Sequence, residues 1–138
     1  MVLHASEVLI NARLSTVWDV LTDAGNMPVW DSGITEIDGD LRDGETVRIT
    51  TSRRGRPVRA RVRQDAGEVM TWTSALPLRL LRVVQSFTLV PDSGRTLLKV
   101  TVETAGPLRR WSSPATRQDL DDFVAAARHR AELLDRTS

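Results

Sequence analysis

The sequence predicts an α+β fold, in which a curved antiparallel sheet of six or seven strands wraps around a long C-terminal helix, with two short helices after the first strand. Residues 34–104 read as short β segments separated by turns, whereas helical patterns occur only near the beginning and at the end of the chain. The last long stretch, residues 111–136, has the apolar spacing of an amphipathic helix. Because 138 residues suffice for one hydrophobic core, we expect a single domain over residues 1–138.

The first elements are predicted from local signals. Residues 3–12 alternate loosely between apolar and polar side chains and favour a first strand. Ser15 is the expected N-cap of a short helix, which Gly25 and Pro28 end. A second short turn then carries Trp30.

The central strands are indicated by alternation and by turn residues. Residues 58–63 alternate strictly, with valine and alanine on one face and arginine on the other, which is typical of an antiparallel strand with one buried face. Turns rich in Gly and Asp separate this segment from its neighbours and favour hairpins. The other strands are expected at residues 34–38, 46–52, 69–74, 82–90 and 96–104.

The terminal helix has both a start signal and an apolar face. Ser113 is a natural N-cap, and Pro114 suits the first helical position, where no backbone N–H is needed. The apolar residues at helical spacing are Leu120, Phe123, Val124, Ala127, Ala131 and Leu134. Such a face packs on the sheet, and it either closes a solid core or walls a cavity.

Composition excludes several function classes. The chain has no cysteine, which excludes disulfides, thiolate metal sites and cysteine nucleophiles, and no cofactor or metal spacing is recognisable. A formal net charge of +1 gives no overall attraction to nucleic acid or to an anionic membrane. The first twelve residues lack a basic lead and a long apolar run, so we expect neither a signal peptide nor a membrane span, and a cytoplasmic location.

Two motifs carry a family resemblance. Residues 17–23 read Val-Trp-Asp-Val-Leu-Thr-Asp and are followed by Met-Pro-Val-Trp at 27–30, while residues 87–92 read Phe-Thr-Leu-Val-Pro-Asp ahead of Gly94 and Thr96. Together with the terminal helix, this order resembles the START-like superfamily, also called the SRPBCC or polyketide cyclase/dehydrase and lipid-transport superfamily. The resemblance covers nearly the whole chain.

The resemblance implies a helix-grip fold that encloses a mostly apolar pocket. Members of this superfamily bind lipids, polyketides, hormones or aromatic molecules, and some catalyse cyclisation or dehydration. We therefore expect the chain to bind a small hydrophobic or amphipathic ligand in an internal cavity. The alternatives are a cyclase or dehydratase acting on an aromatic or polyketide-like substrate, and a protein-interaction module with a filled core. The oligomeric state is left open.

The expected cavity lining follows from strand parity and from the helix face. Four tryptophans against two phenylalanines is an unusual balance for a solid core, although Trp72 fits a core position as well as a cavity wall. Gln85 is an isolated polar residue on an apolar face, so it either bonds a neighbouring side chain or is offered to a ligand. The predicted lining is Trp30, Met70, Trp72, Gln85, Phe87, Val100, Val102, Leu120, Phe123, Val124 and Ala127.

Catalytic residues are not identified by the sequence. General acid or base work would have to use His4, Asp31 or Glu36, and no Ser-His-Asp order is present.

Six arginines fall within residues 53–63 and raise the rival hypothesis of phosphate or nucleic-acid binding. Stacking aromatics are missing from this segment, so a solvated outer face is favoured, and we expect no nucleic-acid partner.

Overall fold

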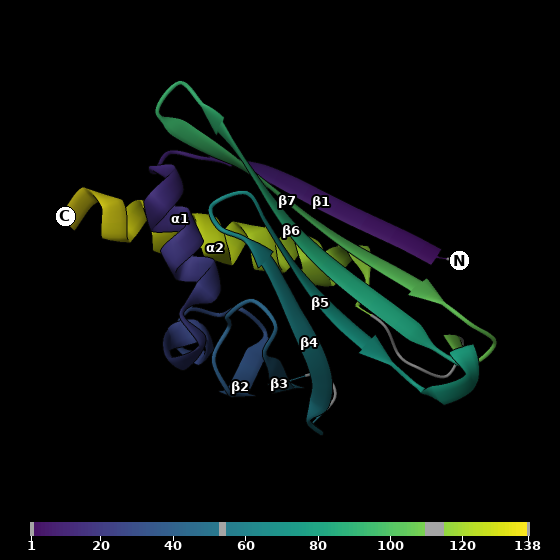
Figure 1. The fold of residues 1–138 in the computed structure, drawn as a ribbon. Helices are drawn as coiled ribbons and strands as arrows, with labels where there is room; N and C mark the ends of the chain where they lie inside the picture. The colour runs from purple at the N-terminus through teal and green to yellow at the C-terminus, as the bar shows by residue number, and fades with distance from the viewer. Residues whose placement is uncertain (1, 53–54, 110–114, 138) are drawn as a thin grey trace.

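The computed structural model describes residues 2–52, 55–109 and 115–137. Its seven strands form one curved antiparallel sheet in the order β1-β7-β6-β5-β4-β3-β2 (Figure 1). The strands are β1 (Val2–Ile10), β2 (Ile34–Asp38), β3 (Thr46–Thr51), β4 (Val58–Asp65), β5 (Val69–Ala75), β6 (Arg82–Asp92) and β7 (Arg95–Ala105). The sequence-predicted strands are all present, and each boundary falls within two residues of its expected place.

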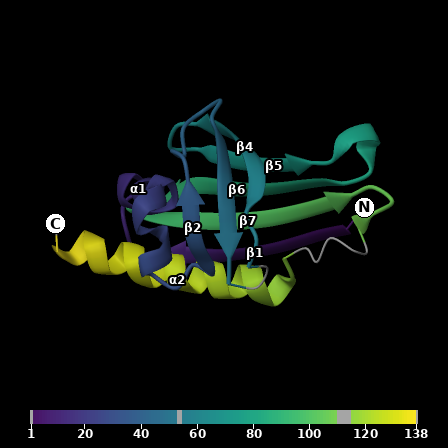
Figure 2. The same cartoon turned by 90° about the horizontal axis from the view of Figure 1, so that it is seen from below.

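The two α-helices lie on the concave side of this sheet. The helical elements are α1 (Leu14–Thr22), the short 3-10 helices η1 (Ala24–Val29) and η2 (Pro77–Arg79), and α2 (Arg117–Thr137). Figure 2 shows α2 running along the sheet, with α1 beside its C-terminal half. This is the predicted α+β helix-grip architecture.

The core lies between the concave face of the sheet and one side of α2. The helix buries Leu120, Phe123, Val124, Ala127 and Ala131, which are five of the six residues expected on its apolar face. Leu134 is 37% exposed, because the last turns of α2 extend beyond the sheet (Figure 1). The predicted alternation in β4 holds as well, since Ala60 and Val62 are buried while Arg59, Arg61 and Arg63, which alternate with them, are exposed.

The structure describes one of the two predicted helix caps. Helix α1 begins at Leu14 with Arg13 at the N-cap position and no side-chain cap, so the prediction that Ser15 caps it was wrong. Ser113 and Pro114 lie outside the described residues. Helix α2 begins with a reciprocal cap in which the Asp119 N–H donates to Thr116 Oγ1 (3.2 Å) and the Thr116 N–H donates to the Asp119 carboxylate (2.8 Å).

A polar clamp holds α1 against α2. The carboxylate of Asp135 accepts hydrogen bonds from Arg13 Nε and from Thr16 Oγ1, each at 2.8 Å. These two donors favour the ionised carboxylate and therefore lower the pKa of Asp135. The clamp ties the start of α1 to the end of α2.

The β5–β6 connection, residues 76–81, is hereafter the leucine loop. Its backbone is closed by hydrogen bonds from the Leu76 N–H to the Leu81 carbonyl (2.9 Å) and from the Leu80 N–H to the Pro77 carbonyl (3.3 Å). The Leu108 N–H donates to the Leu80 carbonyl (3.0 Å), which fastens the loop to the segment after β7. The loop therefore has a defined, hydrogen-bonded conformation.

Gly106 lies directly beneath this loop, and we expect Gly106→Ala to destabilise the protein. A Cβ at residue 106 would stand 2.4 Å from the Leu80 carbonyl oxygen, and the φ of +109° disfavours any side chain. We expect a loss of about 2–4 kcal/mol in urea unfolding, from strain plus the shift of the loop. Gly44→Ala is the control, because Gly44 has a φ of +86° but nothing within 4 Å of its Cβ position. Equal losses in the two variants would show that the contact with Leu80 is unimportant.

Candidate functional site

The candidate site is a pocket of about 650 Å³ between the concave face of the sheet and the first turns of α2. It occupies the end of the sheet that carries the leucine loop. The strands β2 to β7 and α2 all contribute to its walls. The lining residues are Asp31, Ser32, Gly33, Ile34, Ile49, Thr51, Ser52, Pro57, Val58, Arg59, Ala60, Trp72, Ser74, Ala75, Leu76, Leu81, Val83, Gln85, Val102, Ala115, Asp119, Leu120, Asp122 and Phe123.

Strand register explains where the pocket ends. Met70, Phe87 and Val100 are partners across β5, β6 and β7, and all three are fully buried. Two residues further toward the leucine loop, Trp72, Gln85 and Val102 form the next row, and these three line the pocket. The first row therefore belongs to the closed core, and the second is the deepest row of the pocket.

An aromatic chain connects the pocket wall to the core. The Trp72 and Phe87 ring centroids are 4.6 Å apart, those of Phe87 and Phe123 are 5.6 Å apart, and those of Phe123 and Trp30 are 5.4 Å apart. All three pairs are tilted, an arrangement favoured by the ring quadrupoles. These ring contacts connect β5, β6, α2 and the end of η1, so they fix the width of the pocket at its closed end.

Two polar side chains stand side by side in the deepest row. Trp72 is 5% exposed, and its Nε1 is buried without a hydrogen-bond partner in the described part of the chain. The Gln85 amide likewise makes no hydrogen bond to another described residue, yet its atoms are not sealed from solvent. Because Gln85 lies between Trp72 and Val102 on the concave face, the space that its amide faces is the pocket.

A buried serine shapes the mouth of the pocket. Ser32 Oγ donates to the Met27 carbonyl (2.7 Å) and accepts from the Ile34 N–H (3.1 Å). These bonds fix the turn between η1 and β2, in which Asp31 has a left-handed φ of 57°. The turn is thus a rigid rim and holds Asp31 at the pocket lining.

The predicted lining residues divide into two groups. Trp72, Gln85, Val102, Leu120 and Phe123 do line the pocket. Trp30, Met70, Phe87, Val100 and Ala127 are buried in the core around its closed end, and Val124 lies against a separate groove on the far side of α2. Strand parity placed Met70, Phe87 and Val100 on the concave face but could not place them along the strands.

Ionisable groups at the pocket differ from those singled out in the sequence. Among the three candidates for acid or base work, Asp31 lines the pocket, whereas His4 and Glu36 do not. Sequence reasoning missed Asp119 and Asp122, which reach the lining from the first turns of α2. Their spacing of three residues on one helix face was an available signal.

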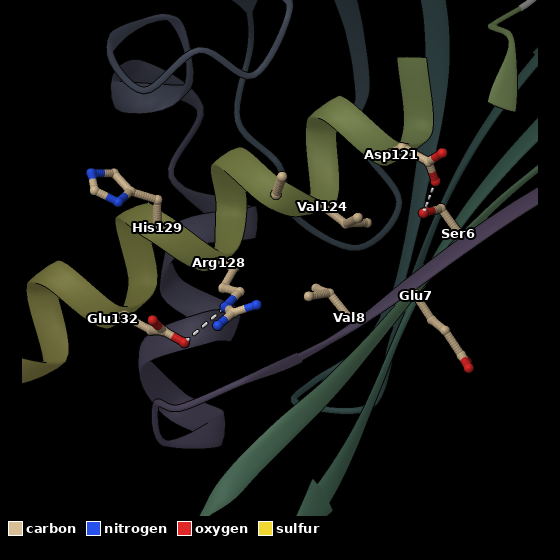
Figure 3. A pocket seen from close by; sticks show the side chains of 9 residues that line it. Ser6, Glu7, Val8, Asp121, Val124, Arg128, His129 and Glu132 are labelled. Carbon is tan, nitrogen blue, oxygen red and sulfur yellow. Dashed lines mark hydrogen bonds and ion pairs between the residues drawn. The ribbon is translucent and has the colours of Figure 1, made fainter. Parts of the chain in front are cut away.

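A second, shallower groove lies between β1 and α2 (Figure 3). Its volume is about 460 Å³, and its polar groups largely bond one another. Ser6 Oγ donates to the Asp121 carboxylate, Arg128 Nε pairs with Glu132 at 3.2 Å, and the Asn11 N–H also donates to Glu132. His129 points away from β1 (Figure 3). Because its polar groups already bond one another, the groove is a weaker candidate for a ligand site than the larger pocket.

The arginine-rich segment lies mostly on the outer face of the sheet. Arg59, Arg61 and Arg63 are exposed on β4, and Arg59 also reaches the pocket lining. Arg53 and Arg54 lie outside the described residues.

Solved structures share this architecture. A protein from Mesorhizobium loti, MLL2253, superposes with a TM-score of 0.76 at 21% identity, with 99% of each chain covered. A START superfamily protein from Mycobacterium smegmatis gives 0.66 at 16% identity, covering 98% of this chain and 97% of that one. The di-domain ARO/CYC protein BexL gives 0.75 at 17% identity, where 97% of this chain spans 47% of that one. A search of curated proteins found no match.

A curved sheet that grips a long terminal helix, with a pocket between the two, defines the START-like class of proteins. The sequence agrees, because residues 1–132 match the family described as polyketide cyclase/dehydrase and lipid transport. The chain belongs to that family, as its two motifs and terminal helix predicted. In the described residues, no helix is long and apolar enough to cross a membrane.

Proposed function

We propose that this protein binds a small, neutral, largely hydrophobic molecule in the pocket between the sheet and α2, and that residues 1–138 act as one such binding domain. The observation that carries the proposal is the pocket of about 650 Å³, which lies within the range of ligand sites in proteins. An interaction module with a filled core, the second alternative, would leave no such space. Family membership supports the same class of function.

The lining favours a neutral ligand with one polar group. Val102, Phe123 and the ring carbons of Trp72 present apolar surface at the closed end, and the Gln85 amide is the polar group that is open to the pocket there, since Trp72 Nε1 is itself buried. An amide both donates and accepts hydrogen bonds, so a carbonyl or hydroxyl group on the ligand would satisfy it. Leaving that amide unpaired against an apolar ligand would cost affinity.

The cyclase or dehydratase alternative draws its support from Asp31, Asp119 and Asp122, which place carboxylates at the pocket. General acid or base catalysis needs such a group within reach of the reacting atoms. BexL, described as an ARO/CYC protein, shares the fold with this chain. We favour ligand binding over catalysis, because ligand binding needs only the pocket lining and no proton transfer by these carboxylates.

We expect Gln85→Leu to weaken binding of 2-acetylnaphthalene about tenfold, because only the ketone can pair with the amide, whereas 2-ethylnaphthalene should bind the variant at least as tightly as it binds the unaltered protein. Isothermal titration calorimetry with the two probes measures both effects. Ser86→Ala is the matched control, since Ser86 is the next residue of β6 and points to the opposite face. Equal losses for the two probes would contradict the role of Gln85, and failure of both probes to bind the unaltered protein would contradict the proposal as a whole.

A further inference from the structure

The leucine loop exposes more apolar surface than a connection of its length requires. Leu78 is 90% exposed, the highest value among the exposed large hydrophobic residues, and Leu76 and Leu80 are 45% and 37% exposed. In both views the loop projects beyond the end of the sheet (Figures 1 and 2). Exposed apolar surface gathered at one protruding tip marks a contact site for another apolar phase.

The backbone is strained in a way that holds this apolar tip outward. Leu78 and Arg79 have φ values of 59° and 56°, a conformation that non-glycine residues rarely adopt. The hydrogen bonds of the loop and the close packing of Gly106 beneath it maintain that conformation. Strain that the surrounding structure enforces is typical of functional segments.

The other long hairpin of the sheet provides a contrast. The β6–β7 turn also contains a residue with positive φ, Ser93, but its tip consists of Asp92, Ser93 and Gly94. A polar tip is the ordinary solution for a turn in water. The leucines at the β5–β6 tip therefore are not a consequence of hairpin geometry.

Charge and position indicate the occupant. Residues 75–82 contain two arginines, Arg79 and Arg82, and no acidic residue, and both arginines are exposed. Leu76 and Leu81, at the two ends of the loop, line the pocket. Three leucine side chains offer far less than the roughly 800 Å² per partner that a stable protein interface buries. Apolar side chains flanked by arginine do suit the boundary between anionic headgroups and acyl chains.

We propose that the leucine loop docks on the surface of an anionic lipid bilayer. Leu78 enters the boundary between headgroups and acyl chains, and Arg79 and Arg82 face the anionic headgroups. The attraction is local, which is why the net charge of +1 for the whole chain does not predict it. Docking brings the pocket, which begins at Leu76 and Leu81, next to the bilayer, so a hydrophobic molecule would pass between the two without crossing water.

The test is co-sedimentation of the ligand-free protein with vesicles of phosphatidylcholine and phosphatidylglycerol, compared with vesicles of phosphatidylcholine alone. We expect binding to the anionic vesicles that weakens with salt and that falls at least tenfold in Leu78→Ser. Arg79→Asn keeps a residue that tolerates positive φ and should reduce the preference for anionic vesicles. Val29→Ser is the matched control, because Val29 is 66% exposed but lies in η1, and its vesicle binding should be unchanged.

Several outcomes would overturn the proposal. The proposal is wrong if the unaltered protein sediments with neither vesicle type, or if Leu78→Ser binds the anionic vesicles as well as the unaltered protein does. It is also wrong if the unaltered protein binds no vesicles and forms a dimer that Leu78→Ser abolishes. The loop would then contact a second copy of the chain instead of a bilayer. Because the assay contains no pocket ligand, its failure leaves the proposed binding function to be judged separately by the naphthalene probes.

Discussion

Phe87→Ala is expected to lower the free energy of unfolding by about 3–5 kcal/mol, the usual cost of emptying a phenylalanine site in a closed core. Phe87 is fully buried on β6, and its ring contacts both Trp72 and Phe123. Removing the ring breaks the aromatic chain between the sheet and α2 at its centre. Urea denaturation followed by tryptophan fluorescence and circular dichroism measures the loss.

Val90→Ala is the control for this prediction, because Val90 lies on the same strand but is 49% exposed. Its loss should stay near or below 1 kcal/mol. A loss in Phe87→Ala no larger than that of Val90→Ala would mean that Phe87 borders empty space, and that the pocket extends past the row that we regard as closed.

Ala60→Phe is expected to remove measurable binding of 2-acetylnaphthalene, a fall of about a hundredfold or more, while the protein stays folded. Ala60 is 3% exposed on the concave face of β4, and it lines the pocket. A phenyl ring there occupies space that the probe needs. The probe then buries less of its apolar surface, and its affinity falls in proportion to the area lost. Calorimetry measures the binding, and thermal unfolding shows whether the fold survives the added volume, whose cost is about 1–3 kcal/mol.

Thr73→Phe is the matched control for pocket filling. Thr73 lies on β5 next to Trp72 and faces the convex side, so the same ring added there does not enter the pocket. Unchanged affinity in Thr73→Phe together with unchanged affinity in Ala60→Phe would show that the probe binds elsewhere.

The fold was predictable because local patterns and global architecture agree. Strict alternation in β4 and turn residues between strands identified the sheet, and the spacing of Leu120, Phe123 and Ala127 identified the buried face of α2. Caps were less predictable. Ser15 has the right chemistry for an N-cap, yet α1 starts at Leu14 with Arg13 at the N-cap, two residues earlier than predicted, and its start is held instead by the Asp135 clamp from α2. Such a partner 119 positions away leaves no local signal.

Sequence patterns predicted which face of the sheet carries the pocket, but not how far the pocket extends along the strands. Period-two alternation assigns Trp72, Gln85 and Phe87 to the concave side, but it does not say that Phe87 is covered while Gln85 is open. That difference depends on where α1 and α2 cross the sheet. The rim, including Ser32 and Leu76, comes from turns whose side chains follow no period, so no sequence pattern placed these residues at the site.

The most direct measurement is a crystal structure of the protein with 2-acetylnaphthalene. We expect the naphthalene ring to lie between the sheet and α2, against Trp72 and Phe123, with its carbonyl oxygen within hydrogen-bond distance of the Gln85 amide nitrogen. Probe found only outside the pocket, or an interior filled by side chains, would contradict the conclusion that this protein is built to bind a small hydrophobic molecule.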